Sequence, residues 1–180
     1  MRKINKTLLL FSLLSSFCAW NDGFASTGVI IQNTNPTDTG PGQWPTPRFI
    51  SAKKTDNSTC NDAEYDKLTG LMWAKDGSAS GSIAWSDAVS YAKKLSLCGY
   101  NDWRLPTVNE LRSLVNYADT TSPAHWLNAN GFSGIQSDFY FSATIFSPNA
   151  KDVWVLSMAG GWIGPIDSAL GYVLPVRGPN

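Results

Sequence analysis

The segment from Gly99 to Leu111 constrains the fold of this chain most strongly, because a rigid Trp-Arg-Leu-Pro turn at residues 103–106 leads straight into a helix start. Thr107 and Glu110 have the Thr-x-x-Glu spacing of a capping box, in which each side chain satisfies a backbone N–H that the first helical turn leaves unpaired. The spacing predicts a helix after Thr107. Its apolar face carries Leu111, Leu114, Val115 and Ala118.

The first 25 residues have the pattern of an export signal. A basic start with Arg2, Lys3 and Lys6 precedes an apolar run from about Leu8 to Trp20, and small residues lead to Ala25. We expect cleavage after Ala25 and an exported protein, whether secreted, at the cell surface or in the periplasm. The apolar run is shorter than the roughly 20 residues of a spanning helix, so we expect no membrane-spanning segment, with an uncleaved anchor as the alternative.

The charge of the remaining chain argues against nucleic acid as a partner. Three of the 14 basic residues and one of the 14 acidic residues lie in the first 25 positions, which leaves 11 basic and 13 acidic groups. The longest basic runs are pairs, Lys53-Lys54 and Lys93-Lys94. A nucleic-acid binder concentrates Lys and Arg on one face, so neither DNA nor RNA is an expected partner.

Cleavage of the signal removes Cys18 and leaves Cys60 and Cys98 in an oxidising compartment, where pairing is the ordinary outcome. We therefore predict one structural disulfide. A metal site or a catalytic thiol pair is the alternative, but the chain has one histidine, His125, and no Cys-x-x-Cys motif. The sequence predicts no metal and no cofactor.

The chain has the length of one domain, preceded by an arm. Residues 26–59 are rich in Thr, Asn, Pro and Gly without apolar periodicity, so they predict an extended arm or linker, in which Gly28–Ile31 is a candidate short strand. The domain is predicted to span residues 60–180.

Two short helices and several later strands are expected in this domain. Residues 84–95 place apolar side chains on one helical stripe, and the second helix follows Thr107. Residues 139–146, 153–158 and 172–176 have the length and composition of strands, with 159–161 as a hairpin link. This order predicts an α+β fold, with two short helices packed on a mainly antiparallel, twisted sheet and Pro175 at an edge or bulge.

Several short motifs make the chain similar to a known family. They are Thr69-Gly70-Leu71-Met72-Trp73, Trp85 with Ala88 and Tyr91, Gly99 to Thr107, Glu110-Leu111, and Val176-Arg177-Gly178, with Trp44 to Phe49 as a lead-in. In order and spacing they resemble the Lcl C-terminal domain family, named for a bacterial collagen-like adhesin. The resemblance covers about Arg48 to Gly178. It implies a C-type-lectin-like fold, a secreted or surface location and, in the adhesin, binding of host polysaccharides.

Two departures limit what this resemblance implies. The chain has neither the Glu-Pro-Asn or Gln-Pro-Asp motif nor the Trp-Asn-Asp triplet of calcium-dependent sugar binding, since Asn101-Asp102-Trp103 has another order. No loop clusters the carboxylates that Ca²⁺ requires. The near-neutral charge also does not fit a sulfated polysaccharide.

Seven tryptophans follow the signal, and they divide into core and surface candidates. Trp73, Trp85 and Trp103 are expected in the core, because aromatic residues within such motifs usually fill interiors. Trp126 and Trp162 lie in stretches predicted to be a loop and a turn, where an indole remains partly exposed. The predicted contacts to a glycan or surface protein are Trp126, Asp152, Trp154 and Trp162.

Arg104 and Arg177 are predicted to be structural, because a guanidinium ties loops together through carbonyl oxygens and a carboxylate such as Asp102 or Glu110. Anion binding by either arginine is the alternative.

Catalysis is not expected. His125 has no nucleophile motif beside it, and nothing in the sequence places Asp152 and Asp167 within reach of one substrate. We therefore expect a binding or adhesion domain that is not an enzyme. The alternatives are a structural or assembly subunit, which forms a homo-oligomer, and a periplasmic enzyme with its pocket around His125.

Overall fold

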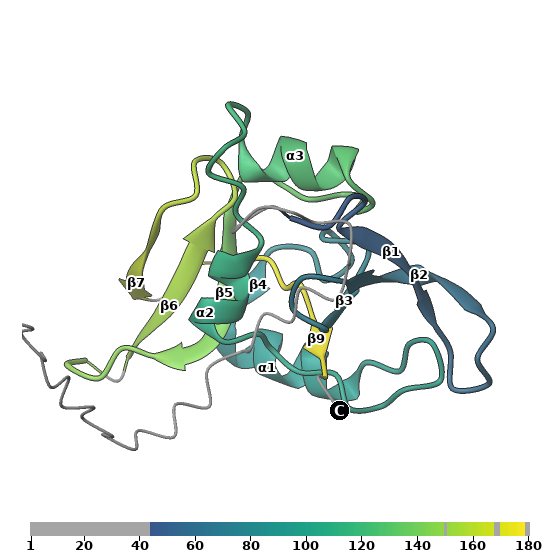
Figure 1. Ribbon diagram of the computed structural model, residues 1–180. Helices are drawn as coiled ribbons and strands as arrows, with labels where there is room; N and C mark the ends of the chain where they lie inside the picture. Colours follow the sequence, from purple (N-terminus) through teal and green to yellow (C-terminus); the bar gives the residue numbers. More distant parts are fainter. Residues whose placement is uncertain (1–43, 150, 168–169, 179–180) are drawn as a thin grey trace, which may run out of the picture.

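The computed structural model describes residues 44–149, 151–167 and 170–178 (Figure 1). The predicted signal at residues 1–25 and the candidate strand at Gly28–Ile31 lie outside the described residues. The helices are α1 (Trp85–Lys94), α2 (Val108–Ser113) and α3 (Pro123–Ala129). The strands are β1 (Phe49–Lys53), β2 (Thr59–Asp66), β3 (Met72–Ala74), β4 (Ile83–Ala84), β5 (Phe139–Ile145), β6 (Asp152–Ser157), β7 (Ile163–Asp167), β8 (Leu170–Gly171) and β9 (Val176–Arg177).

The strands form three sheets in the part of the chain that the structure describes. One has the order β1-β2-β3-β9, one has the order β5-β6-β7, and β4 pairs with β8. Every pair of these strands is antiparallel, which confirms the α+β class with antiparallel pairing. The single sheet that the sequence predicted is instead divided. In Figure 1 the β5-β6-β7 sheet and the β1-β2 hairpin lie on opposite sides of the molecule.

β1 extends the folded body upstream of residue 60. It pairs with β2 from Phe49↔Asp66 to Lys53↔Thr59, and Phe49 is buried. Residues 49–53 were assigned to the arm at 26–59, so the domain boundary at residue 60 is corrected. A bulge between Ser51 and Ala52 spaces the buried residues three apart, which removes the alternation by which a strand is recognised in sequence.

Among the described residues the helices number three rather than the predicted two. α1 lies within the predicted 84–95, whereas α2 ends at Ser113, so Leu114 and Val115 enter the core from beyond its end. α3 occupies a stretch predicted to be a loop. The Ser122 hydroxyl accepts the backbone N–H of His125 at 3.2 Å, and Pro123 is its first residue, which is a favourable helix start.

The central core joins both larger sheets to α2 and α3. It is built around the fully buried Trp73 and Tyr140, with Leu111 from α2, Leu127 from α3 and Val176 from β9. A second apolar cluster packs under α1 against Phe141 and Val155. A third surrounds the disulfide.

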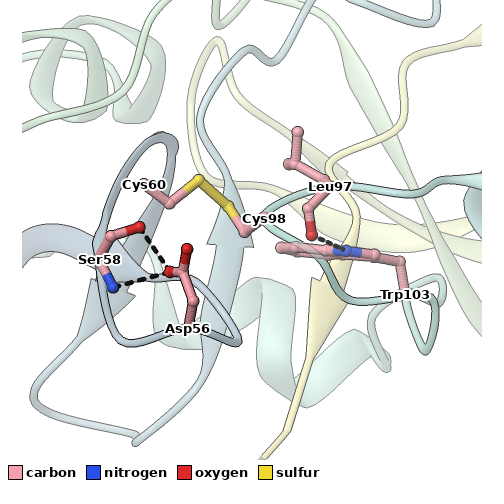
Figure 2. Close-up of a disulfide and its surroundings, with 6 residues drawn as sticks. All are labelled: Asp56, Ser58, Cys60, Leu97, Cys98 and Trp103. Carbon is pink, nitrogen blue, oxygen red and sulfur yellow. Dashed lines mark hydrogen bonds between the residues drawn. A yellow bond between two sulfur atoms is a disulfide. The ribbon is translucent and has the colours of Figure 1, made fainter.

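The predicted disulfide joins Cys60 of β2 to Cys98, with the two Cα atoms 5.7 Å apart. Figure 2 shows Leu97 and Trp103 beside it, where the Trp103 indole N–H donates to the Leu97 carbonyl at 3.2 Å. The bond thus fixes the turn after α1 to the four-stranded sheet, and Trp103 is buried as predicted.

The two arginines tie the turn at 103–106 to the end of the domain. Arg104 donates to both Glu110 carboxylate oxygens, at 2.7 and 2.8 Å, and to the Gly178 carbonyl at 3.1 Å. Arg177 makes a similar two-pronged contact to Asp102 and lies 3.7 Å from the ring centroid of Tyr100. The capping box also forms, since Glu110 accepts the N–H of Thr107 and donates its own to the Thr107 hydroxyl.

Removal of the disulfide should weaken the fold substantially. The bond closes a loop with a sequence separation of 38, and in the chain-entropy model such a closure contributes about 4 kcal/mol. We expect the Cys60→Ala/Cys98→Ala protein to lose about 3–4 kcal/mol in urea unfolding. Reduction of the wild type should give a similar loss, and an unchanged midpoint in both experiments would contradict the assigned role.

Glu110 should make stability depend on pH. Burial opposes its ionisation, but the hydrogen bonds and charge of Arg104 and the Thr107 N–H outweigh this and lower the pKa of Glu110. A lowered folded-state pKa stabilises the fold above the unfolded pKa, and this contribution is lost as the pH falls through the folded pKa. Glu110→Gln should cost about 1–2 kcal/mol at neutral pH.

The measurement is urea unfolding from neutral to acidic pH. The wild type should lose stability on acidification more steeply than Glu110→Gln. Asp87→Asn, at an exposed carboxylate in the first turn of α1, is the control that should keep the steep dependence. Equal slopes for wild type and Glu110→Gln would contradict the assignment.

Candidate functional site

An open cleft of about 480 Å³ lies between β2, β3 and the second half of α1. Its volume falls within the roughly 300–1,000 Å³ typical of small-molecule sites. Apolar side chains provide part of the wall, namely Ala74, Ala79, Leu95 and Leu97. The polar lining consists of Asn61, Asp62, Lys75, Asp76, Tyr91 and Ser133.

The disulfide positions two walls of this cleft relative to each other. Asn61 and Asp62 directly follow Cys60 in β2, and Leu97 directly precedes Cys98. Leu97 is further held by reciprocal backbone hydrogen bonds with Tyr100, at 3.0 and 3.1 Å. The disulfide therefore joins the wall formed by β2 to the wall formed by the turn at Leu97, at the edge of the cleft.

Asp76 is oriented by its own turn. One carboxylate oxygen accepts both the backbone N–H and the hydroxyl of Ser78, each at 2.8 Å. The backbone of Ser133 lies beside it, with its N–H bonded to the Lys75 carbonyl and its carbonyl accepting from Gly77. Because Asp76 is exposed and only one of its oxygens makes these bonds, the carboxylate keeps acceptor capacity toward the cleft.

Lys75 brings a positive charge that is already neutralised. Its ammonium lies 3.0 Å from Glu64, whose side chain is 4% exposed, while that of Lys75 is 33% exposed. A buried carboxylate without this partner would be costly. The ion pair therefore holds the Lys75 ammonium against the sheet, and Lys75 offers little attraction for an anion in the cleft.

Tyr91 contributes a neutral phenol from α1. Burial raises the pKa of Tyr91, and the negative charge of Asp76 raises it further. The hydroxyl makes no hydrogen bond to any residue in the described ranges, so it remains able to donate and accept one. The cleft thus combines an aromatic ring, a phenol, an amide and two carboxylates.

The four ligand contacts predicted from sequence lie outside the cleft, and Asp152 and Trp154 are the two that share one face of a strand, β6. Trp126 lies on α3, half-buried, with its ring 5.3 Å from that of Trp44. Trp162 is 51% exposed and contacts Phe139. None of the four lines the cleft.

Asp152 and Trp154 share one face of β6, two residues apart. Trp154 packs edge-on against Phe146, with centroids 5.8 Å apart, and Asp152 accepts from the Asn149 amide at 3.0 Å. Asp152 stands opposite Asp167 in the β6-β7 register. The proximity of these two aspartates was not deducible from sequence, because it depends on the hairpin register.

The cleft residues other than Tyr91 carried no strong signal in the sequence. Asp76-Gly77-Ser78 is a recognisable Asx-turn pattern, but such turns are common on any surface. Tyr91 was noted only as part of the family resemblance. Within the described ranges, no group of three or more His, Cys, Asp and Glu is arranged to hold a metal ion.

A family model for the Lcl C-terminal domain matches residues 63–177. The chain therefore belongs to the Lcl C-terminal domain family, as its motifs indicated, and this membership suggests a surface-associated domain. No curated protein matches the chain significantly. In the described part of the chain, no helix has the length and apolarity needed to cross a bilayer.

Gly134 is predicted to be needed for the position of Asp76. A Cβ at Gly134 would lie 2.6 Å from both the Asp76 carboxylate and the Ser78 hydroxyl, at a φ of +64°. Gly81 has the same φ of +64° with open space around it, so Gly81→Ala carries the backbone strain without the collision. We expect Gly134→Ala to be the more destabilising by about 1 kcal/mol or more in urea unfolding. Equal losses would show that Gly134 does not constrain Asp76.

Proposed function

We propose that this protein is an exported, surface or periplasmic binding domain of C-type-lectin-like architecture that holds a glycan in the cleft and does not transform it. The export proposal draws support from the N-terminal sequence and from the Cys60–Cys98 disulfide, a bond typical of oxidising compartments. Membership of the Lcl C-terminal domain family supports the surface association.

The observation that carries the proposal is the composition of the cleft. An apolar wall and the Tyr91 ring suit the C–H face of a sugar ring, while carboxylate, amide and phenol groups suit its hydroxyls. A concavity that combines apolar side chains with a few polar groups is typical of a small-molecule site.

A glycan fits this site better than a folded surface protein. Standard protein interfaces bury roughly 800 Å² on each partner over a fairly flat patch. The candidate site is a concavity of about 480 Å³. Its dimensions suit one or two sugar units rather than a protein face.

That the cleft binds without catalysis is part of the proposal. Its described lining residues contain no Ser–His or Cys–His pair for nucleophilic catalysis, and the proposal assigns the two lining carboxylates, Asp62 and Asp76, to holding the ligand. The alternative of a periplasmic enzyme places the pocket around His125. That residue is exposed on α3 and does not line the cleft.

The test fills the cleft without disturbing the core. Ala79 is exposed and lines the cleft, so Ala79→Trp should block it, whereas Ala118→Trp places the same ring at an exposed site between α2 and α3. We expect a glycan array of neutral, amine-bearing and acidic sugars to give ligands for the wild type and Ala118→Trp, and at least about tenfold weaker binding by Ala79→Trp.

Amide NMR titration with the bound sugars then locates the site. Shifts should concentrate at residues 74–79 and 91–97. Shifts centred on Trp154 and Asp152 or on Trp162, with full binding by Ala79→Trp, would refute the cleft. An array without any ligand would refute glycan binding.

A further inference from the structure

We propose that the cleft selects sugars bearing a free amine, such as de-N-acetylated hexosamine units, over N-acetylated and over sulfated or uronate-bearing glycans. This inference rests on the proposed function, because it assigns the chemical class of ligand to the same cleft. It follows from the charges that line the cleft and from how each is already engaged.

The cleft presents uncompensated negative charge. Asp62 and Asp76 are both exposed in its lining, and Lys75, the one cation among the described lining residues, is paired with Glu64 at 3.0 Å. The Lys75–Glu64 pair is neutral as a whole, so Asp62 and Asp76 give the described lining a net negative charge. An anionic glycan would meet repulsion from this wall, and an ammonium group would meet attraction.

The charges on α1 do not alter this balance. Tyr91 and Leu95 line the cleft, and the charged residues on neighbouring turns of the same stripe are Asp87, four positions before Tyr91, and Lys94, three positions after it. They carry opposite signs. The net negative character of the cleft is therefore set by β2 and by the turn after β3.

The uncharged groups explain why the ligand is a sugar amine rather than an isolated cation. The Tyr91 ring suits both a pyranose face and an ammonium, because the face of an aromatic ring attracts cations. The Asn61 amide and the Tyr91 hydroxyl add donors and acceptors for ring hydroxyls. N-acetylation removes the positive charge and leaves the ring hydroxyls unchanged, but it also adds an acetyl group, so the salt dependence of the preference is what reports the contribution of the charge.

The experiment compares three oligosaccharides of equal length by calorimetry, with the disulfide intact. They are a β-1,4-glucosamine oligomer, its fully N-acetylated counterpart and a heparin fragment. We expect the glucosamine oligomer to bind about tenfold more tightly than the acetylated one, with this preference shrinking as salt is raised. The heparin fragment should bind most weakly.

Asp62→Asn and Asp76→Asn should each weaken glucosamine binding by up to about fivefold and leave the acetylated oligomer unaffected. Asp119→Asn is the matched control, because Asp119 accepts from Thr121 in the same kind of turn as Asp76 but lies between α2 and α3. It should bind like the wild type.

The outcomes separate this inference from the proposed function. Equal or tighter binding of the acetylated oligomer or of heparin, still blocked by Ala79→Trp, would overturn the amine preference and leave glycan binding standing. Failure of all three sugars, together with a glycan array that gives no ligand, would overturn both. A lysine-rich peptide that binds more tightly than the glucosamine oligomer would also overturn the assignment, because the ammonium would then suffice without a sugar.

Discussion

The covalent link between Cys60 and Cys98 is the constraint on which the candidate site depends. It joins the strand that carries Asn61 and Asp62 to the turn that carries Leu97, and the Trp103 indole N–H bonded to Leu97 supports that turn from behind. The hydrogen bonds of the turn at Leu97 each contribute only about 1 kcal/mol net, so the cross-link is the strongest single tie between that turn and β2. The cross-link provides the rigidity that a preformed site requires.

The charged residues divide into those that build the domain and those left for a ligand. Arg104 and Arg177 each engage a carboxylate through two hydrogen bonds, and Lys75 is bound to buried Glu64. Arg48 adds a fourth, fully buried pair with Asp66. Because these cations are engaged in ion pairs, the exposed carboxylates of the cleft determine its electrostatic character. Although the chain is nearly neutral overall, the cleft thus has a net negative charge.

Local signals in the sequence were reliable where one short segment carried the whole interaction. The capping box at Thr107 and Glu110, the stripe of α1 and the Ala159–Gly161 link all formed as expected, because each depends on neighbours a few residues apart. The sequence does not predict β1 because its bulge disrupts the alternation, and it predicts a loop where α3 forms because a helix of seven residues that begins at a proline shows little apolar periodicity. The sequence analysis selected its candidate ligand contacts by residue type, namely Trp126, Asp152, Trp154 and Trp162. The residue type alone does not indicate where in the fold a side chain lies.

The sequence by itself determined the cysteine pairing, the α+β class, the turn before α2 and the family, because each rests on composition or on spacing along the chain. Only the tertiary structure decided that Asp62, Asp76 and Tyr91 face one cleft and that Lys75 is paired within it. These residues come from different elements, β2, β3 and its following turn, and α1. Their proximity is fixed by long-range packing and by one cross-link, for which a linear sequence contains no periodic or local signature.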